Sequence, residues 1–416
     1  MRSESSYLRA LAGPGALRFC VAGLVGRMQI AMTGLGTVLL VASITGRYAL
    51  AGAVAAAGSG GYALVSPLAA RLADRFGQGR VLPPFVLVYA ASTVGLIGCA
   101  ELRAPGWALI ACSGLAGAAT PQIGSMVRAR WSAQLGGSPL LQAAFSLESV
   151  ADEVIFVAGP VLVTLLATGV HPAAGLVVAA VTCVAGSLLL AAQRVTEPPT
   201  GPVGVGRGDG GRLLPARGLV TLAPVGLFFG AVLAAIDLAT VDFAQQNGHK
   251  PLAGLVLGGY ALGSAVGGLW YGARTWHAPL RRRLILALSA AAAGTATFWA
   301  MPGLGVLAVA MLFSGLALSP MLITCFSLIE RQAPPSRQTE GMAWLTSAIS
   351  VGTAAGSAAA GQIIDTAGAR WGYVFAAACA AAALLASLLG LSRLTVPSPT
   401  ASQERTALAG QTPPSR

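Results

Sequence analysis

Twelve long apolar runs fill most of this 416-residue chain. They cover residues 19–41, 48–70, 81–100, 106–126, 140–167, 173–192, 219–243, 252–272, 284–300, 304–328, 342–364 and 372–391. A run of about 20 apolar residues has the length of a helix that crosses a bilayer. With 55% hydrophobic and only 10% charged residues, the composition excludes a water-soluble enzyme. We predict an all-α membrane protein of twelve transmembrane helices, because a helix satisfies its own backbone polar groups in lipid.

The basic residues are distributed unevenly between alternate loops. If the N-terminus lies inside, 21 of the 26 Lys and Arg residues fall in cytoplasmic segments, and Arg27 alone lies within a span. Positive charges near membrane ends stay on the cytoplasmic side. We therefore predict a multi-pass protein of the cytoplasmic membrane with both termini in the cytoplasm. These cations form no basic face, so nucleic acid is not an expected partner despite the net charge of +12.

A change in composition divides the chain near its midpoint. Residues 194–218 are rich in Gly and Pro and have no apolar period, which predicts a cytoplasmic linker. We expect one six-helix bundle over 1–193 and another over 219–393. The polar stretch 394–416 is expected to be a disordered cytoplasmic tail.

A weak internal repeat supports this division. The sequence GGYAL at 60–64 recurs at 258–262, and SGLA at 113–116 recurs at 314–317. The two offsets are nearly equal and fall in corresponding runs of each half. A parallel duplication of six helices explains both matches.

A charged motif follows the second apolar run and reads ARLADRFGQGR over residues 70–80. It resembles the signature loop of the major facilitator superfamily, Gly-x-Leu-Ala-Asp-Arg-x-Gly-Arg-Arg, which joins the second and third helices. Ala70 replaces the leading Gly, and Gln78 and Gly79 stand where the family usually has basic residues. Topology and duplication agree with the resemblance, which covers about residues 15–395.

The resemblance implies two pseudo-symmetric six-helix bundles that rock about a central site by alternating access. It also implies a gating loop formed by Asp74, Arg75, Gly77 and Arg80. At a helix end, Asp74 can pair with Arg side chains or with a helix N-terminus of the other bundle. Gly77 permits the tight turn. The alternative is a simple turn placed by its positive charges. In the second half Gly272 stands where Asp74 does, so the second gate is degenerate.

Gly159 and Pro160 in the fifth run resemble the core of the antiporter signature of drug exporters in this superfamily. Ile155 replaces a Gly of that pattern, and Ser113 stands near the place of the fourth-helix Arg of proton-coupled members. Proline frees a backbone carbonyl and glycine permits close helix approach, so this pair is a candidate helix bend. A Gly-Pro pair without that function is the alternative.

Ionisable side chains inside the runs are few and clustered. Each costs about 2.5–3.5 kcal/mol at a helix centre. Glu148 and Asp152 share one helix face, whereas Glu153 points about 100° away from Asp152. Arg27 is their candidate partner. Two roles stay open: a site that carries protons or binds substrate, and a static pair that holds the first and fifth helices together.

Further candidates for substrate contact follow from position in the runs. Asp237 lies in the seventh run, which lines the cavity in this superfamily. Pro121 and Gln122 in the fourth run and Trp344 in the eleventh are candidates for lining the same cavity. No phosphate-binding loop occurs, and the six cysteines show no CxxC spacing, so we expect no cofactor and no metal.

The residues together favour a secondary active transporter, not an enzyme. We expect proton-coupled efflux of a small hydrophobic or amphipathic molecule, because few buried polar groups are available to recognise a sugar. Proton-coupled uptake of a metabolite is one alternative. A non-transporting sensor or scaffold with the same fold is another. The expected partners are the substrate, protons and the bilayer, and the expected state is a monomer.

Overall fold

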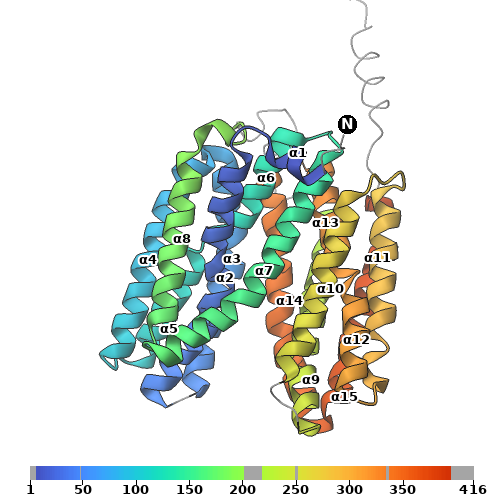
Figure 1. The fold of residues 1–416 in the computed structure, drawn as a ribbon. Coiled ribbons are helices and arrows are strands. Elements are labelled where there is room, and N and C mark those ends of the chain that lie inside the picture. Colours follow the sequence, from blue (N-terminus) through green and yellow to red (C-terminus); the bar gives the residue numbers. More distant parts are fainter. Residues whose placement is uncertain (1–5, 47, 201–217, 249–251, 334–336, 395–416) are drawn as a thin grey trace, which may run out of the picture.

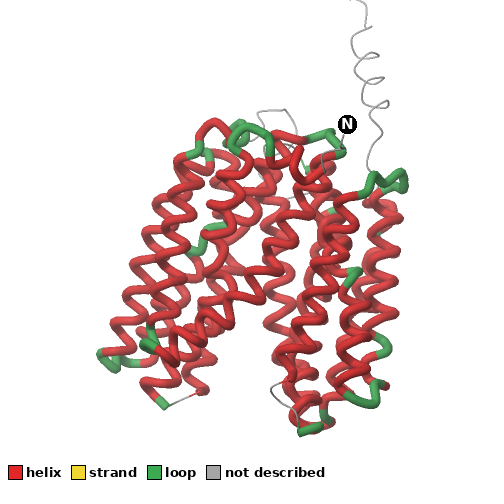
Figure 2. The backbone as a smooth tube through the Cα atoms, viewed as in Figure 1, coloured by secondary structure: helices red, strands yellow, loops and turns green. Residues whose placement is uncertain are grey.

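The computed structural model describes residues 6–46, 48–200, 218–248, 252–333 and 337–394. Within these ranges every regular element is a helix (Figure 2). Most of the expected linker and the expected tail lie outside the described residues.

The first half of the chain forms eight α-helices and one 3₁₀ turn. They are α1 (Ser6–Leu11), α2 (Ala16–Thr45), α3 (Tyr48–Phe76), α4 (Gln78–Glu101), α5 (Gly106–Ala118), α6 (Ile123–Leu135), α7 (Leu140–Gly169), α8 (Ala174–Ala192) and η1 (Arg194–Thr196). The second half contains α9 (Leu219–Gln246), α10 (Ala253–Ala273), α11 (Leu280–Thr295), η3 (Phe298–Ala300), α12 (Leu304–Gly315), α13 (Leu318–Gln332), α14 (Gln338–Ala367), α15 (Ala369–Leu389) and η5 (Leu391–Leu394).

Ten segments of the described chain are long and apolar enough to cross a membrane. The other two predicted spans differ from these in a physical way. Helices α5 and α6 are interrupted at residues 119–122, so neither is long enough alone. Helix α14 has 30 residues, but Ser, Thr and Gly dilute its apolar content. With these two included, the twelve predicted spans all correspond to helical segments.

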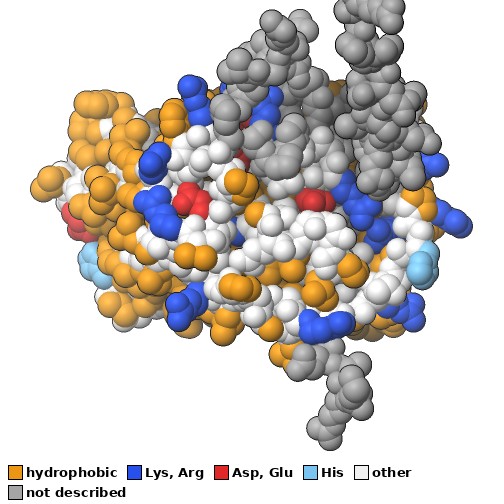
Figure 3. Space-filling view, turned by 90° about the horizontal axis from the view of Figure 1, so that it is seen from above, with side chains coloured by type: hydrophobic (Ala, Val, Ile, Leu, Met, Phe, Trp, Pro, Cys, Tyr) orange, Lys and Arg blue, Asp and Glu red, His pale blue; other side chains and the backbone are white. Residues whose placement is uncertain are grey.

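The helices form two bundles, α2 to α8 and α9 to α15 (Figure 1). Between the bundles, α3 packs against α14, and α7 packs against α10 and α13. The bundles lie closest at the end that carries the N-terminus, and their helices diverge toward the other end. We call the first end the N-terminal face. Figure 3 looks onto this face and shows Lys and Arg side chains around its rim.

Glycine allows the helices within a bundle to approach closely. A Cβ atom added to Gly230 of α9 would lie 2.0 Å from the carbonyl oxygen of Ile349, and one added to Gly352 of α14 would lie 1.8 Å from that of Leu227. No side chain fits at such distances. These glycines therefore set the α9–α14 spacing, a packing role typical of small residues in membrane helices.

Candidate transport site and gate

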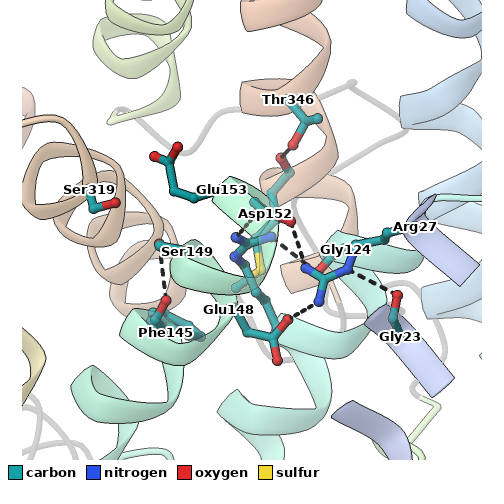
Figure 4. Close-up of polar contacts among 12 residues, drawn as sticks. Gly23, Arg27, Gly124, Phe145, Glu148, Ser149, Asp152, Glu153, Ser319 and Thr346 are labelled. Atoms are coloured by element: carbon teal, nitrogen blue, oxygen red, sulfur yellow. Dashed lines mark hydrogen bonds and ion pairs between the residues drawn. The ribbon is translucent and has the colours of Figure 1, made fainter. Parts of the chain in front are cut away.

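A buried ion-pair cluster joins α2, α6 and α7 (Figure 4). Arg27 Nη2 lies 2.5 Å from Glu148 Oε2, and its Nη1 lies 2.9 Å from Asp152 Oδ1. The side chains of Arg27 and Glu148 are 1% and 2% exposed. The structure thus pairs Arg27 with both carboxylates for which the sequence nominated it as a partner.

A second cation completes the cluster. Arg128 Nη2 lies 2.6 Å from Asp152 Oδ2, and its guanidinium stacks over the Phe326 ring of α13 at 4.2 Å. The apolar runs placed Arg128 in a cytoplasmic loop and left Arg27 as the one cation within a span. The structure places Arg128 within α6, which continues nine residues past the predicted span end and buries it at 4% exposure.

Hydrogen bonds satisfy the rest of the Glu148 carboxylate. Trp131 Nε1 donates to Glu148 Oε1 at 3.0 Å, and the Cys20 thiol donates to the same oxygen at 3.6 Å. Two guanidinium groups therefore face two carboxylates, and the four charges balance. A cluster bonded in this way favours the static role that the sequence left open, because every charge already has a partner.

Glu153 points away from this cluster, toward the other bundle (Figure 4). Its Oε1 accepts a hydrogen bond from the Ser264 hydroxyl of α10, and Ser264 Oγ lies 2.9 Å from Ser319 Oγ of α13. In the described part of the chain no cation lies within salt-bridge distance of Glu153. The carboxylate is therefore held at the boundary between the bundles by neutral partners alone.

Asp237 of α9 likewise has no ion-pair partner among the described residues. Its side chain is exposed. Asp237 and Glu153 both lie within electrostatic range of the Tyr260 hydroxyl of α10. Tyr260 is 5% exposed and its hydroxyl has no partner among the residues described.

The gating loop contacts the other bundle through Asp74. Asp74 Oδ2 accepts a hydrogen bond from the backbone N–H of Glu340 at 2.9 Å, in the first turn of α14. The acid of one bundle thus caps a helix of the other, where the free N–H groups and the helix dipole favour a negative charge. Farther along the same two helices, α3 and α14, the Ser66 and Ser347 hydroxyls form a hydrogen bond across the same boundary.

The other predicted members of the loop make no contact of this kind. Arg75 is exposed and stacks on its neighbour Phe76 at 5.0 Å, and Arg80 is exposed with no ion pair in the structure as described. Gly77 has φ of 93°, and a Cβ there would lie 2.6 Å from Glu197 Oε1. Glycine is therefore required at this turn by conformation and by space.

Two residues that the sequence did not nominate hold the loop in place. Arg130 of α6 is fully buried and donates to Gln78 Oε1 at 2.8 Å, as well as to acceptors at the end of α8. Glu197 Oε1 accepts from the Gly79 N–H at 3.0 Å, at the start of α4. Gln78, a departure from the family motif, thus becomes the acceptor for a buried arginine. The polar side chain of Gln78 in this turn was the feature of the sequence that pointed to such a partner.

The second half closes its equivalent turn without an acid. Gln142 Nε2 of α7 donates to the carbonyl oxygens of Tyr271 and Arg274 at 2.7 and 3.1 Å, and Ser146 donates to that of Gly268 at 2.5 Å. A Cβ on Gly272 would lie 2.3 Å from Ser146 Cβ. Side-chain to backbone bonds and close packing replace the missing carboxylate.

Of the remaining candidates, four lie in the first bundle and Trp344 lies in α14 of the second. A Cβ on Gly159 would lie 2.6 Å from that of Ala31, so this glycine lets α7 approach α2, and Pro160 follows inside α7. Pro121 and Gln122 lie at the break between α5 and α6, where Tyr62 donates to Gln122 Oε1 at 3.3 Å. Trp344 is half-buried in α14.

Comparisons with known proteins agree with this architecture. The family model described as Major Facilitator Superfamily matches residues 220–415. No curated protein matches the chain in sequence. Among solved structures, a bacterial homologue of the iron transporter ferroportin in the outward-facing state is 16% identical, with a TM-score of 0.72 over 91% of this chain and 100% of that one.

Two sugar transporters have similar folds. FucP in the outward conformation is 14% identical, with a TM-score of 0.71 over 92% of this chain and 99% of that one. The proton:xylose symporter XylE is 15% identical, with a TM-score of 0.69 over 94% of this chain and 96% of that one. The fold and the family match define a membrane transporter. The fold is that of major facilitator superfamily transporters, and the family model matches the second half of the chain.

Proposed function

We propose that this transporter exports a small amphipathic molecule in exchange for protons, and that Glu153 carries the coupling proton. The observation behind this proposal is the position of Glu153 at the bundle boundary, bonded to Ser264 of the other half. A movement of one bundle against the other changes this contact directly. Protonation of Glu153 and the conformation of the transporter are thereby linked.

The charge balance of the buried groups supports Glu153 over its neighbours. Glu148 and Asp152 are neutralised by Arg27 and Arg128, so a proton on either would leave a buried cation uncompensated. Glu153 has only neutral partners among the described residues, and an ionised carboxylate in such a place is costly. Asp237, which also lies within electrostatic range of Tyr260, likewise lacks a cation among the described residues and is a second group that can exchange a proton or contact a cationic part of the cargo.

The contacts between bundles support alternating access. The cross-bundle hydrogen bonds of Asp74, Ser66 and Gln142 lie in the half of the molecule nearer the N-terminal face. We infer that this face is cytoplasmic and closed, and that the bonds break when it opens. The similar structures described as outward-facing support the same assignment.

We infer the cargo class from the side chains around Tyr260. Phe229, Val232, Leu318 and Met321 lie beside it around a void of about 20 Å³, which is too small to hold the cargo in this conformation. An apolar surface with a hydroxyl and two carboxylates nearby suits a molecule with one polar end. Proton-coupled uptake is the second candidate, since one of the similar folds is described as a proton:xylose symporter.

Proton movement in proteoliposomes tests the proposal. Purified protein is challenged with lipophilic amines, antibiotics and neutral metabolites while lumenal pH is recorded. We expect one class to release lumenal protons from wild type, and Glu153→Gln to abolish that release. Asp242→Asn is the matched control and should leave release unchanged. Asp242 accepts a hydrogen bond from Gln246 at the C-terminal end of α9. Equal release by Glu153→Gln and wild type would remove Glu153 from the mechanism.

A further inference from the structure

A recess of about 350 Å³ lies on the outer surface of the second bundle, at the N-terminal face. It is formed where the start of α11 meets η5. Its lining residues are Arg281, Arg282, Ile285, Leu286, Leu391 and Ser392. None of these residues belongs to the transport site or to the gate.

The three consecutive arginines at the start of α11 differ in their burial and in their partners. Arg283 is buried and donates to Gln142 Oε1 at 2.7 Å and to the Tyr271 hydroxyl at 3.0 Å, so its charge serves the bundle interface. Arg281 and Arg282 are exposed, and no acid among the described residues pairs with either. The recess therefore carries two cations whose counter-charge must come from outside the described protein.

The other walls of the recess are apolar and lie deeper along α11. Leu286 is 59% exposed, and Ile285 and Leu391 are partly exposed. By the rise of a helix, Ile285 and Leu286 lie about 5–8 Å beyond the arginines along the axis. Cations at the membrane surface with apolar side chains directly below match the boundary between lipid headgroups and acyl chains.

We propose that this recess binds an anionic phospholipid, with the phosphate between Arg281 and Arg282 and an acyl chain along Leu286 and Leu391. Guanidinium groups bind phosphate oxygens through paired hydrogen bonds, which a zwitterionic headgroup weakens by its own cation. Basic pockets between helices on the cytoplasmic side are suited to anionic headgroups. Free phosphate satisfies the arginines alone, whereas a phospholipid also covers the apolar walls.

Thermal unfolding in detergent with added lipid tests this assignment. We expect phosphatidylglycerol to raise the Tm of wild type more than phosphatidylcholine or glycerol phosphate does. Arg281→Gln/Arg282→Gln should lose at least half of that rise. The control is Arg9→Gln/Arg18→Gln, which removes the same charge from exposed positions near the same face of the first bundle and should keep the rise.

A second variant separates the lipid from other anions. Leu286→Ser leaves both arginines in place and should also reduce the rise with phosphatidylglycerol. The proposal fails if Arg281→Gln/Arg282→Gln gives the full wild-type rise, or if phosphatidylcholine acts as well as phosphatidylglycerol. An equal rise with glycerol phosphate would show a phosphate site without a lipid. None of these readouts depends on transport.

Discussion

Arg27 Nη2 lies 2.5 Å from Glu148 Oε2, with both side chains almost wholly withdrawn from solvent. The pair connects α2 to α7 within the first bundle. Each charge stabilises the other in a medium where neither is tolerated alone. The two residues therefore stabilise the protein as a pair, and removing one also removes the contribution of the other.

Arg27→Gln should lower the stability of the purified protein by about 3–5 kcal/mol, because Glu148 is left buried without its cation. The double variant Arg27→Gln/Glu148→Gln should recover part of that loss, since it removes both charges. Thermal unfolding in detergent measures both effects. A double variant no more stable than either single variant would show that the pair is not a coupled unit.

Asp74→Ala should weaken closure of the N-terminal face. The capping interaction with α14 is worth about 0.5–2 kcal/mol, which shifts an opening equilibrium by about 2- to 30-fold. The readout is the rate of maleimide labelling of Ser347→Cys in a cysteine-free protein, because Ser347 is buried at this boundary. Asp365→Ala, near the other end of α14, is the control and should leave the rate unchanged. No acceleration by Asp74→Ala would exclude a gating role.

The gate was predictable from the sequence only in part. The motif nominated Asp74, with either Arg side chains or a helix N-terminus of the other bundle as its partner, and the bond to the Glu340 N–H has the second form. Which helix supplied the N-terminus was not predictable, because the two segments lie 266 positions apart. Arg75 and Arg80 were nominated by the same motif but stay outside the contact. A motif gives residue types, whereas packing decides which of them meet.

Arg130→Lys should destabilise the protein although it keeps the charge. The guanidinium donates to Gln78 Oε1, Thr196 Oγ1 and two carbonyl oxygens, and an ammonium group cannot reach these four acceptors together. Each buried acceptor left unpaired costs about 1–3 kcal/mol. Thermal unfolding should show the loss, while Arg80→Lys at an exposed site should stay within about 0.5 kcal/mol of wild type. Equal stability of the two variants would contradict this assignment.

The charged core shows where prediction from the sequence stopped. Glu148 and Asp152 were placed on one face by helical spacing, and Arg27 was their nominated partner. Arg128 was missed because hydropathy ends the fourth span before it, whereas the helix restarts after Gln122 and continues. Two carboxylates on one face with a single cation were the signal that a second cation was needed.

Gly352→Ala should impair packing of α9 against α14, because the added methyl would overlap the Leu227 carbonyl oxygen. Overpacking of this kind costs about 1–3 kcal/mol. Gly361→Ala adds the same methyl group on the same helix where no atom lies within 4 Å, and should be neutral or slightly stabilising. Unfolding curves of the two variants give the comparison. Two curves that superimpose would show that this close approach is not required.

The central claim is that the two bundles must separate at the N-terminal face during each transport cycle. Ser66 and Ser347 touch across that boundary, so a Ser66→Cys/Ser347→Cys variant in a cysteine-free protein can form a disulfide there. The direct measurement is transport of the compound found in the proton-release panel, before oxidation, after oxidation and after reduction. The account predicts that oxidation stops transport and that reduction restores it. Transport at the same rate through the cross-linked protein would contradict it.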